Sequence, residues 1–125
     1  RLAIRRLIAQ GICLPANRRE EGSETKVSLT QEEAMIHEKS VMPYDVAAIS
    51  GGLLDGAVYA DLDYDLDSNA DVDMNIVMTS DKKFVEVQGT GEEATYSSEE
   101  LDALISSGKN AIEQLFAIQK RTLSE

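Results

Sequence analysis

The sequence has no tryptophan, a single cysteine and a single histidine, and its aromatic residues are two Phe and four Tyr. With Cys13 alone, neither a disulfide framework nor a cysteine-based zinc site is possible. So few aromatic side chains disfavour an RNA-binding surface built on base stacking. No apolar run is long enough to span a membrane and no signal peptide opens the sequence, so we expect a cytoplasmic protein without membrane contact.

Basic residues are also scarce. The 125 residues hold 12 Lys and Arg against 23 Asp and Glu, a net charge of −11, so this segment alone is not expected to grip a phosphate backbone. The length and the 42% hydrophobic content are those of one ordinary globular domain. The chain begins at Arg1, without Met and inside an amphipathic pattern, so we expect the C-terminal part of a longer protein.

The most unusual stretch is the acidic segment 61–75, which contains no Lys, Arg or His. Its six aspartates are Asp61, Asp63, Asp65, Asp67, Asp71 and Asp73. Their mutual repulsion destabilises a compact domain unless a cation or a basic partner offsets it. Because the last carboxylate leads directly into a predicted strand, we predict a divalent metal site; the alternative is a solvated acidic loop. No frame supplies the turning Gly and terminal Glu of an EF-hand, which is excluded.

Helical patterns lie at both ends of the chain. Apolar residues from Leu2 to Ile8 recur at helical spacing, and Gly11 is a natural stop. Segment 17–40 is polar and is predicted to be a charged surface connection, in which a capping box at Thr30 favours a short helix. A second capping box at Ser97 opens a long helix, whose apolar stripe should cover a sheet.

Between these helices the pattern is that of strands. Residues 44–54 and 57–63 flank Asp55-Gly56, a strong hairpin signal, and residues 72–79 and 84–88 flank a turn at 80–83. We expect a four-stranded antiparallel meander, with the last strand broken by Gly89-Thr90-Gly91.

The last two strands allow a prediction of register. If Thr79 faces Phe84 across the turn, then Val77 faces Glu86, Asn75 faces Gln88 and Asp73 faces Thr90. One face then turns six apolar side chains to the core: Val72, Met74, Ile76, Met78, Val85 and Val87. The opposite face gathers a polar cluster beside the acidic segment: Asp73, Asn75, Glu86 and Gln88.

Several motifs together resemble the C-terminal half of bacterial ribonuclease PH. They are Asp-Leu-Asp-Tyr at 61–64, Asp-Met-Asn-Ile-Val-Met at 73–78 and Val-Glu-Val-Gln-Gly-Thr at 85–90, and the resemblance runs from Tyr44 to the end. It implies an α+β, two-layer fold with a mostly antiparallel sheet covered by helices. Residues 1–125 would then be the C-terminal part of a single ribonuclease PH-like domain that is incomplete at its N-terminus.

The resemblance also implies an activity. Members of this family are phosphate-dependent 3′→5′ exoribonucleases, or nucleotidyltransferases, that trim the 3′ ends of tRNA precursors and other RNAs. Inorganic phosphate attacks the terminal phosphodiester and releases a nucleoside diphosphate. The family's catalytic, Mg²⁺-associated acidic positions fall on Asp67 and Asp73. Asn75, Glu86 and Gln88 are candidates to support these ligands. The implied assembly is a homo-oligomer, a hexameric ring.

This chain departs from the family in lacking the phosphate-binding half. The family's Thr-Arg-Thr turn and a further phosphate-binding Arg have no counterpart here, so we expect no phosphate-binding residue in this chain and no activity of the fragment alone. Two other readings stay open. One is a non-catalytic, RNA-guiding subunit of an exosome-like ring, against which the retained Asp67 and Asp73 argue; the other is a general cation-binding acidic module.

Overall fold

The computed structural model describes residues 1–18, 28–62, 65, 68–92 and 94–124. The chain forms two compact units, Arg1–Tyr44 and Asp45–Glu125. Across the described residues, no helix combines the length and the apolar character needed to cross a membrane.

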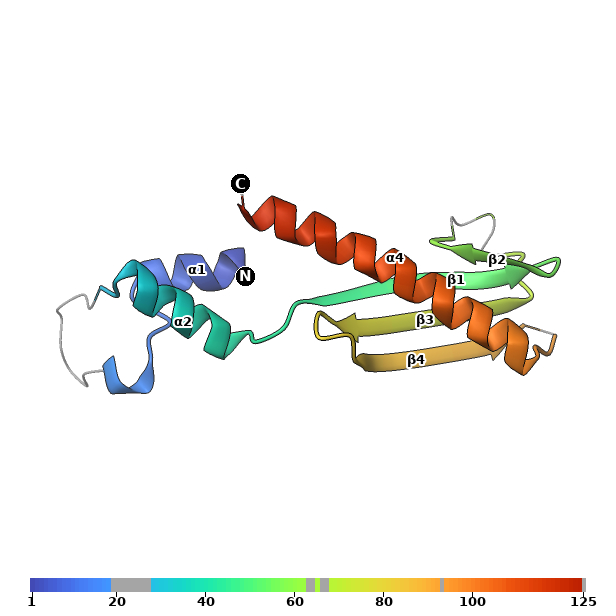
Figure 1. The fold of residues 1–125 in the computed structure, drawn as a ribbon, viewed down its shortest axis with the longest axis horizontal. Helices are drawn as coiled ribbons and strands as arrows, with labels where there is room; N and C mark the ends of the chain where they lie inside the picture. The colour runs from blue at the N-terminus through green and yellow to red at the C-terminus, as the bar shows by residue number, and fades with distance from the viewer. Residues whose placement is uncertain (19–27, 63–64, 66–67, 93, 125) are drawn as a thin grey trace. The chain divides into compact units, whose positions relative to one another are not determined.

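The first unit is a pair of helices. Helix α1 spans Leu2–Ala9, a short 3₁₀ turn spans Ala16–Arg18, and helix α2 spans Gln31–Val41 (Figure 1). The predicted stop after α1 is confirmed, since Gly11 adopts a left-handed φ of 72°. The capping box is also confirmed: the Glu33 backbone N–H donates to Thr30 Oγ1 (3.2 Å), and the Thr30 N–H donates to Glu33 Oε2 (2.9 Å). Segment 17–40, predicted as a surface connection, thus contains most of a helix.

The second unit contains one antiparallel sheet. Its strands are β1 (Val46–Leu54), β2 (Ala57–Ala60), β3 (Val72–Thr79) and β4 (Phe84–Gly91), in the order β2-β1-β3-β4 (Figure 1). The Asp55-Gly56 hairpin is confirmed by left-handed φ values of 51° and 77°.

The predicted meander is wrong, because β1 lies between β2 and β3. Strand β2 was expected to reach residue 63 but ends at Ala60, since Asp61 takes a left-handed φ of 61° that turns the chain out of the sheet. The chain then returns on the other side of β1, which pairs along most of its nine residues with β3.

The predicted register of β3 and β4 is confirmed at three pairs, Asp73–Thr90, Asn75–Gln88 and Val77–Glu86. The first pair is wrong: Met78 faces Phe84, and the irregularity leaves Val85 as an extra residue. Strand β4 also continues to Gly91 instead of breaking after Gln88.

Gly89 is needed in the strand because Tyr96 comes close to its backbone. The Tyr96 hydroxyl donates to the Gly89 carbonyl (3.2 Å), and a Cβ at Gly89 would lie 2.8 Å from that hydroxyl. Gly89 therefore admits the returning chain and does not end the strand.

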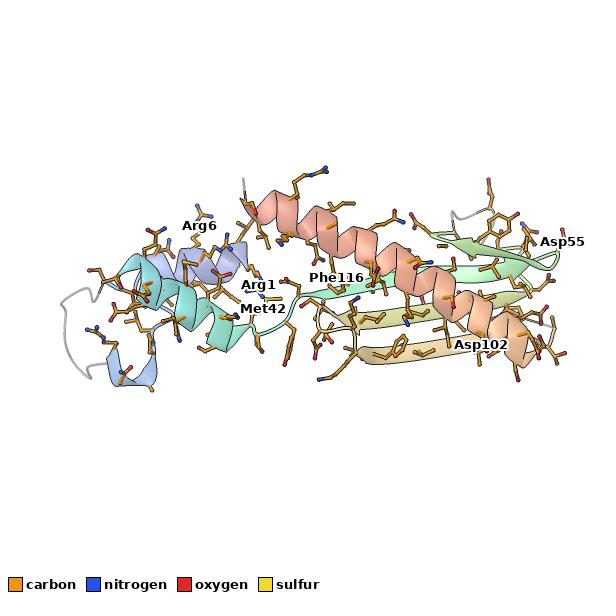
Figure 2. All side chains as sticks on the ribbon, in the orientation of Figure 1. Arg1, Arg6, Met42, Asp55, Asp102 and Phe116 are labelled. Atoms are coloured by element: carbon orange, nitrogen blue, oxygen red, sulfur yellow. The ribbon has the colours of Figure 1, made fainter. Side chains whose placement is uncertain are left out.

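Helix α4 (Ser98–Ser124) covers one face of the sheet (Figure 1). Its predicted capping box is confirmed, with the Glu100 N–H donating to Ser97 Oγ (3.1 Å) and the Ser97 N–H to Glu100 Oε2 (2.7 Å). The buried core joins the sheet to this helix: Ala47, Leu53, Val72, Met74, Ile76, Met78, Leu104 and Ile112. Phe116 packs against that core, whereas Asp102 is exposed (Figure 2).

Two predicted core residues are not in the core. Val85 and Val87 are 62% and 44% exposed. The alternation of β4 does turn Val87 to the side of Ile76, its direct partner. However, β4 is an edge strand, and α4 packs on β1, β2 and β3, so the apolar side of β4 stays uncovered.

Candidate functional site

The polar side chains gather on the open face, defined as the face of the sheet opposite α4. Alternate residues of β3 are buried toward α4, so Asp73, Asn75 and Val77 lie on the open face. Each of these three residues has one direct partner on β1 and one on β4, and each forms a row across the sheet with its two partners. The rows are Gly52–Asp73–Thr90, Ser50–Asn75–Gln88 and Ala48–Val77–Glu86. The structure therefore places the four residues of the predicted polar cluster on one face of the sheet.

A hollow of about 340 Å³ lies along two of these rows. It is lined by Ala48, Ile49, Ser50, Asn75, Ile76, Val77, Glu86 and Gln88. The Ser50 hydroxyl donates to Asn75 Oδ1 at 2.7 Å, which fixes the orientation of the amide. No Lys, Arg or His is among these lining residues, so the hollow offers hydrogen-bonding groups and one carboxylate but no positive charge.

The aspartates of the acidic segment divide by role. Asp71 is a structural residue: its Oδ2 accepts from the Asp55 backbone N–H (3.0 Å), and its own N–H donates to the Leu53 carbonyl (2.8 Å). Within the described part of the chain, Asp73 has no such partner for its carboxylate. Asp73 is thus held on a rigid strand with its oxygens available.

Gly52 allows two residues of the acidic segment, Leu62 and Ala70, to pack next to Asp73. A Cβ at Gly52 would lie 2.6 Å from the Val72 carbonyl oxygen and 2.7 Å from Leu62 Cδ1, with Ala70 Cβ at 3.4 Å. Leu62 and Ala70 are therefore packed on the sheet at the position directly opposite Asp73. Sequence reasoning missed this role of Gly52. Two consecutive glycines inside a strand were the available signal, because such glycines mark close approach of another segment.

The oxygen atoms of the Asp73 side chain suit a hard divalent cation. Magnesium prefers carboxylate and carbonyl oxygens. Asp73 supplies a carboxylate that makes no hydrogen bond or ion pair with any residue that the structure describes. Asp67, the other predicted ligand, and Asp63 lie outside the described residues. Among the residues that are described, no group of three or more His, Cys, Asp and Glu side chains is arranged to hold a metal.

The three supporting candidates lie at different distances from Asp73. Asn75 is the next open-face residue on β3, and Gln88 is its direct partner. Glu86 faces Val77, four residues along β3 from Asp73, which at the rise of a β-strand is about 13 Å away. Asn75 and Gln88 are therefore neighbours of Asp73, whereas Glu86 lies at the far end of the hollow.

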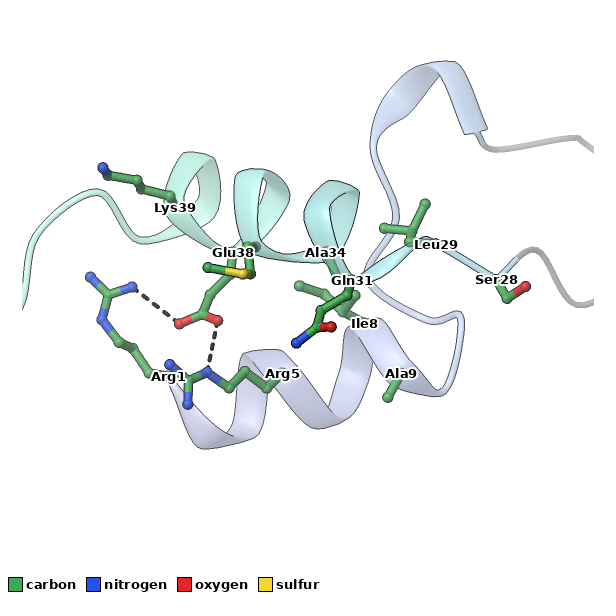
Figure 3. Close-up of a pocket in the computed structure, with 11 residues that line it drawn as sticks. Arg1, Arg5, Ile8, Ala9, Ser28, Leu29, Gln31, Ala34, Glu38 and Lys39 are labelled. Carbon is green, nitrogen blue, oxygen red and sulfur yellow. Dashed lines mark hydrogen bonds and ion pairs between the residues drawn. The ribbon is translucent and has the colours of Figure 1, made fainter. Parts of the chain in front are cut away.

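The first unit contains a second, unpredicted feature, a pocket of about 660 Å³ between α1 and α2 (Figure 3). At one side of it, Glu38 is only 7% exposed and accepts hydrogen bonds from Arg5 Nε (2.8 Å) and Arg1 Nη1 (3.2 Å). The hydrogen bond from Arg5 lowers the pKa of Glu38, burial raises it to a smaller extent, and the hydrogen bond from Arg1 lowers it further. The net pKa lies below the ordinary value of 4.5.

This ion pair makes the packing of α1 and α2 dependent on pH. Because the folded pKa of Glu38 is depressed, its contribution is complete above the ordinary pKa and is lost as the pH falls through the folded value. Glu38→Gln should lower the opening free energy of α2 amides by about 1 kcal/mol near pH 7. Hydrogen exchange measures this, and the difference from wild type should shrink only as the pH falls below the ordinary pKa of 4.5. Glu32→Gln, an exposed change on the same helix, is the control; an equal effect of both changes would contradict the role of the ion pair.

Comparisons with known proteins agree with this architecture. Residues 46–111 match the family model described as 3′ exoribonuclease family, domain 2. The chain is 50% identical over 95 residues to ribonuclease PH of Listeria monocytogenes, an alignment that covers 75% of this chain and 38% of the relative. It is 50% identical over 84 residues to ribonuclease PH of Rhodopirellula baltica, covering 67% and 34%. Ribonuclease PH of Corynebacterium kroppenstedtii is 43% identical over 95 residues, covering 76% and 37%.

The match to the family model takes in every strand and the first part of α4, and the alignments cover only part of each relative. The chain spans 34 to 43% of the length of the curated relatives that it matches. The α+β fold with its antiparallel sheet agrees with the matched domain. More than half of the chain matches the family model, and the chain therefore belongs to the 3′ exoribonuclease family.

Proposed function

We propose that the full-length protein carrying this chain is a phosphate-dependent 3′→5′ exoribonuclease. In this proposal it trims the 3′ ends of tRNA precursors and other RNAs, with inorganic phosphate as co-substrate, and releases nucleoside diphosphates. The names of its relatives and its family support the reaction. The observation that carries the proposal for this chain is the position of Asp73, whose carboxylate lies on a rigid strand beside the packed ends of the acidic segment.

Each residue has a limited task in this proposal. Asp73 and Asp67 hold Mg²⁺, the first from β3 and the second from the part of the acidic segment that precedes β3. The bound cation supplies neutralisation of charge at the scissile phosphate. Gly52 allows the acidic segment to reach the sheet at the row of Asp73. Asn75, oriented by Ser50, presents its amide beside Asp73.

The attacking phosphate needs cations that the open face does not offer. The residues that line its hollow include no Lys, Arg or His, and the chain carries a net charge of −11. Carboxylates repel a phosphate dianion, so the phosphate site belongs to residues of the full-length protein outside this chain. In this proposal the isolated chain is inactive, and the working enzyme is a homo-oligomeric ring in the cytoplasm.

The test is a phosphorolysis assay on the full-length protein. The protein is incubated with Mg²⁺, inorganic phosphate and a tRNA precursor that carries a 3′ extension, and the products are separated by chromatography. We expect nucleoside diphosphates that appear only with phosphate, and none from the isolated chain. Release of nucleoside monophosphates without phosphate, or RNA binding with no release, would contradict the proposal, and the latter would indicate a non-catalytic RNA-guiding subunit.

A further inference from the structure

We infer that the hollow on the open face binds a ribose of the RNA strand upstream of the 3′-terminal nucleotide, and that Glu86 determines specificity for RNA over DNA. This inference rests on the proposed function, because it assigns the end of the RNA to Asp73. It gives Glu86 a task separate from metal binding.

The chemistry of the lining selects a neutral, hydroxyl-rich ligand. The polar groups of the hollow are the Ser50 hydroxyl, the amides of Asn75 and Gln88 and the Glu86 carboxylate, with no cation among them. A phosphate needs cations or clustered N–H donors. A sugar hydroxyl instead can donate a hydrogen bond to a carboxylate and can accept one from an amide N–H. The side chains of Ala48 and Val77 offer small apolar surface against which the carbon atoms of a sugar can pack.

The polar groups of the hollow are also available. Because Asn75 Oδ1 accepts from Ser50, the Asn75 amide nitrogen is left to donate. Within the described part of the chain, the side chains of Glu86 and Gln88 make no hydrogen bond or ion pair, although they lie on adjacent rows of the open face. An ionised carboxylate only accepts hydrogen bonds, so a ligand that binds to Glu86 must offer it a donor such as a hydroxyl. The 2′-hydroxyl is the donor that RNA has and DNA lacks.

The position of Glu86 indicates which ribose it meets. Its row is about 13 Å from that of Asp73, which is too far for a shared terminal nucleotide. The hollow continues along the same face toward Asp73, through the row of Ser50, Asn75 and Gln88. An RNA strand that ends at Asp73 and lies along the open face therefore brings an earlier ribose to Glu86.

The experiment uses the full-length protein and RNA oligonucleotides that carry one 2′-deoxy substitution, placed in turn at each position upstream of the terminal nucleotide. For the wild type, we expect one position at which the substitution lowers kcat/KM for nucleoside diphosphate release about tenfold, the effect of one charge-assisted hydrogen bond. Glu86→Ala should lower kcat/KM about tenfold on all-ribose RNA and show no further loss with that oligonucleotide. Glu113→Ala on α4, whose side chain is exposed and pairs with Lys82, is the control and should behave as wild type.

The outcomes separate this inference from the proposed function. If nucleoside diphosphates are released but Glu86→Ala keeps the full preference for ribose, the inference is overturned and the proposed function stands. If no protein releases them, the proposed function fails, and binding of the same oligonucleotides still tests the hollow. In that case a wild-type Kd that no 2′-deoxy position changes would overturn the inference, and a tenfold weakening that disappears in Glu86→Ala would support it.

Discussion

Asp73→Asn in the full-length protein should reduce nucleoside diphosphate release about a thousandfold while the protein stays folded. The amide keeps the shape of the side chain but removes the negative charge that would hold a cation, and loss of a cation that stabilises transition-state charge costs several kcal/mol. The Asp73 carboxylate has no hydrogen-bond or ion-pair partner within the described residues. Removing its charge from an acidic cluster should therefore leave the unfolding temperature unchanged or slightly higher. Single-turnover assays and thermal unfolding measure the two effects.

Asp71→Asn is the matched control, because it removes the same charge two residues away. Asp71 accepts a hydrogen bond from the Asp55 N–H, and an amide oxygen still accepts it. This variant should keep activity within a few-fold of wild type. A magnesium titration adds a second measurement, since Asp73→Asn should need a higher concentration of Mg²⁺ for its residual activity. Full activity of Asp73→Asn would remove the metal-binding role from Asp73.

The register of β3 and β4 was predictable because two local signals agree. Side chains alternate with a period of two, and the short turn fixes which residues face each other. This agreement placed Asp73, Asn75 and Gln88 correctly. It failed only next to the turn, where the extra residue Val85 shifts the pairing. A bulge depends on how the whole strand twists, and a valine at position 85 does not by itself predict one.

The order of the strands was not predictable in the same way. A hairpin signal such as Asp55-Gly56 reports on neighbours in sequence, so it gave the pairing of β1 with β2. The pairing of β1 with β3 joins residues separated by the whole acidic segment, and no turn motif specifies it. A clue was present in β1 itself, which has Ser50 as its only polar side chain and lacks the charged residues typical of an edge strand.

Burial was mispredicted for a related reason. Alternation tells which side of a strand a residue lies on, and it placed Val87 on the side of Ile76. Whether a helix covers that side depends on how the helix crosses the sheet, and α4 leaves the β4 edge exposed. The pairing of Glu38 with Arg1 and Arg5 was missed because it joins two helices whose packing no local pattern specifies.

Replacement of Gly52, the direct partner of Asp73, should have the second large effect on activity. Gly52→Val should lower nucleoside diphosphate release at least about a hundredfold, because misplacement of a catalytic group by about 1 Å can cost that much. The added side chain would begin 2.6 Å from the Val72 carbonyl oxygen and 2.7 Å from Leu62 Cδ1. Leu62 Cδ1 is the end of a flexible side chain, whereas the Val72 carbonyl belongs to the backbone of β3 next to Asp73, so the added side chain must displace the backbone that carries Asp73. Overpacking of this kind should also cost about 1–3 kcal/mol of stability. Activity assays and urea unfolding test both expectations.

Gly56→Ala separates loss of stability from loss of the site. Gly56 has a left-handed φ of 77° and open space around its Cβ position, so alanine there should cost about 1 kcal/mol through backbone strain alone. Its turn lies at the end of the hairpin, and activity should be near that of wild type at temperatures where both proteins are folded. If Gly52→Val lost stability but retained activity, the reaction would not depend on the close packing around Gly52 and Asp73.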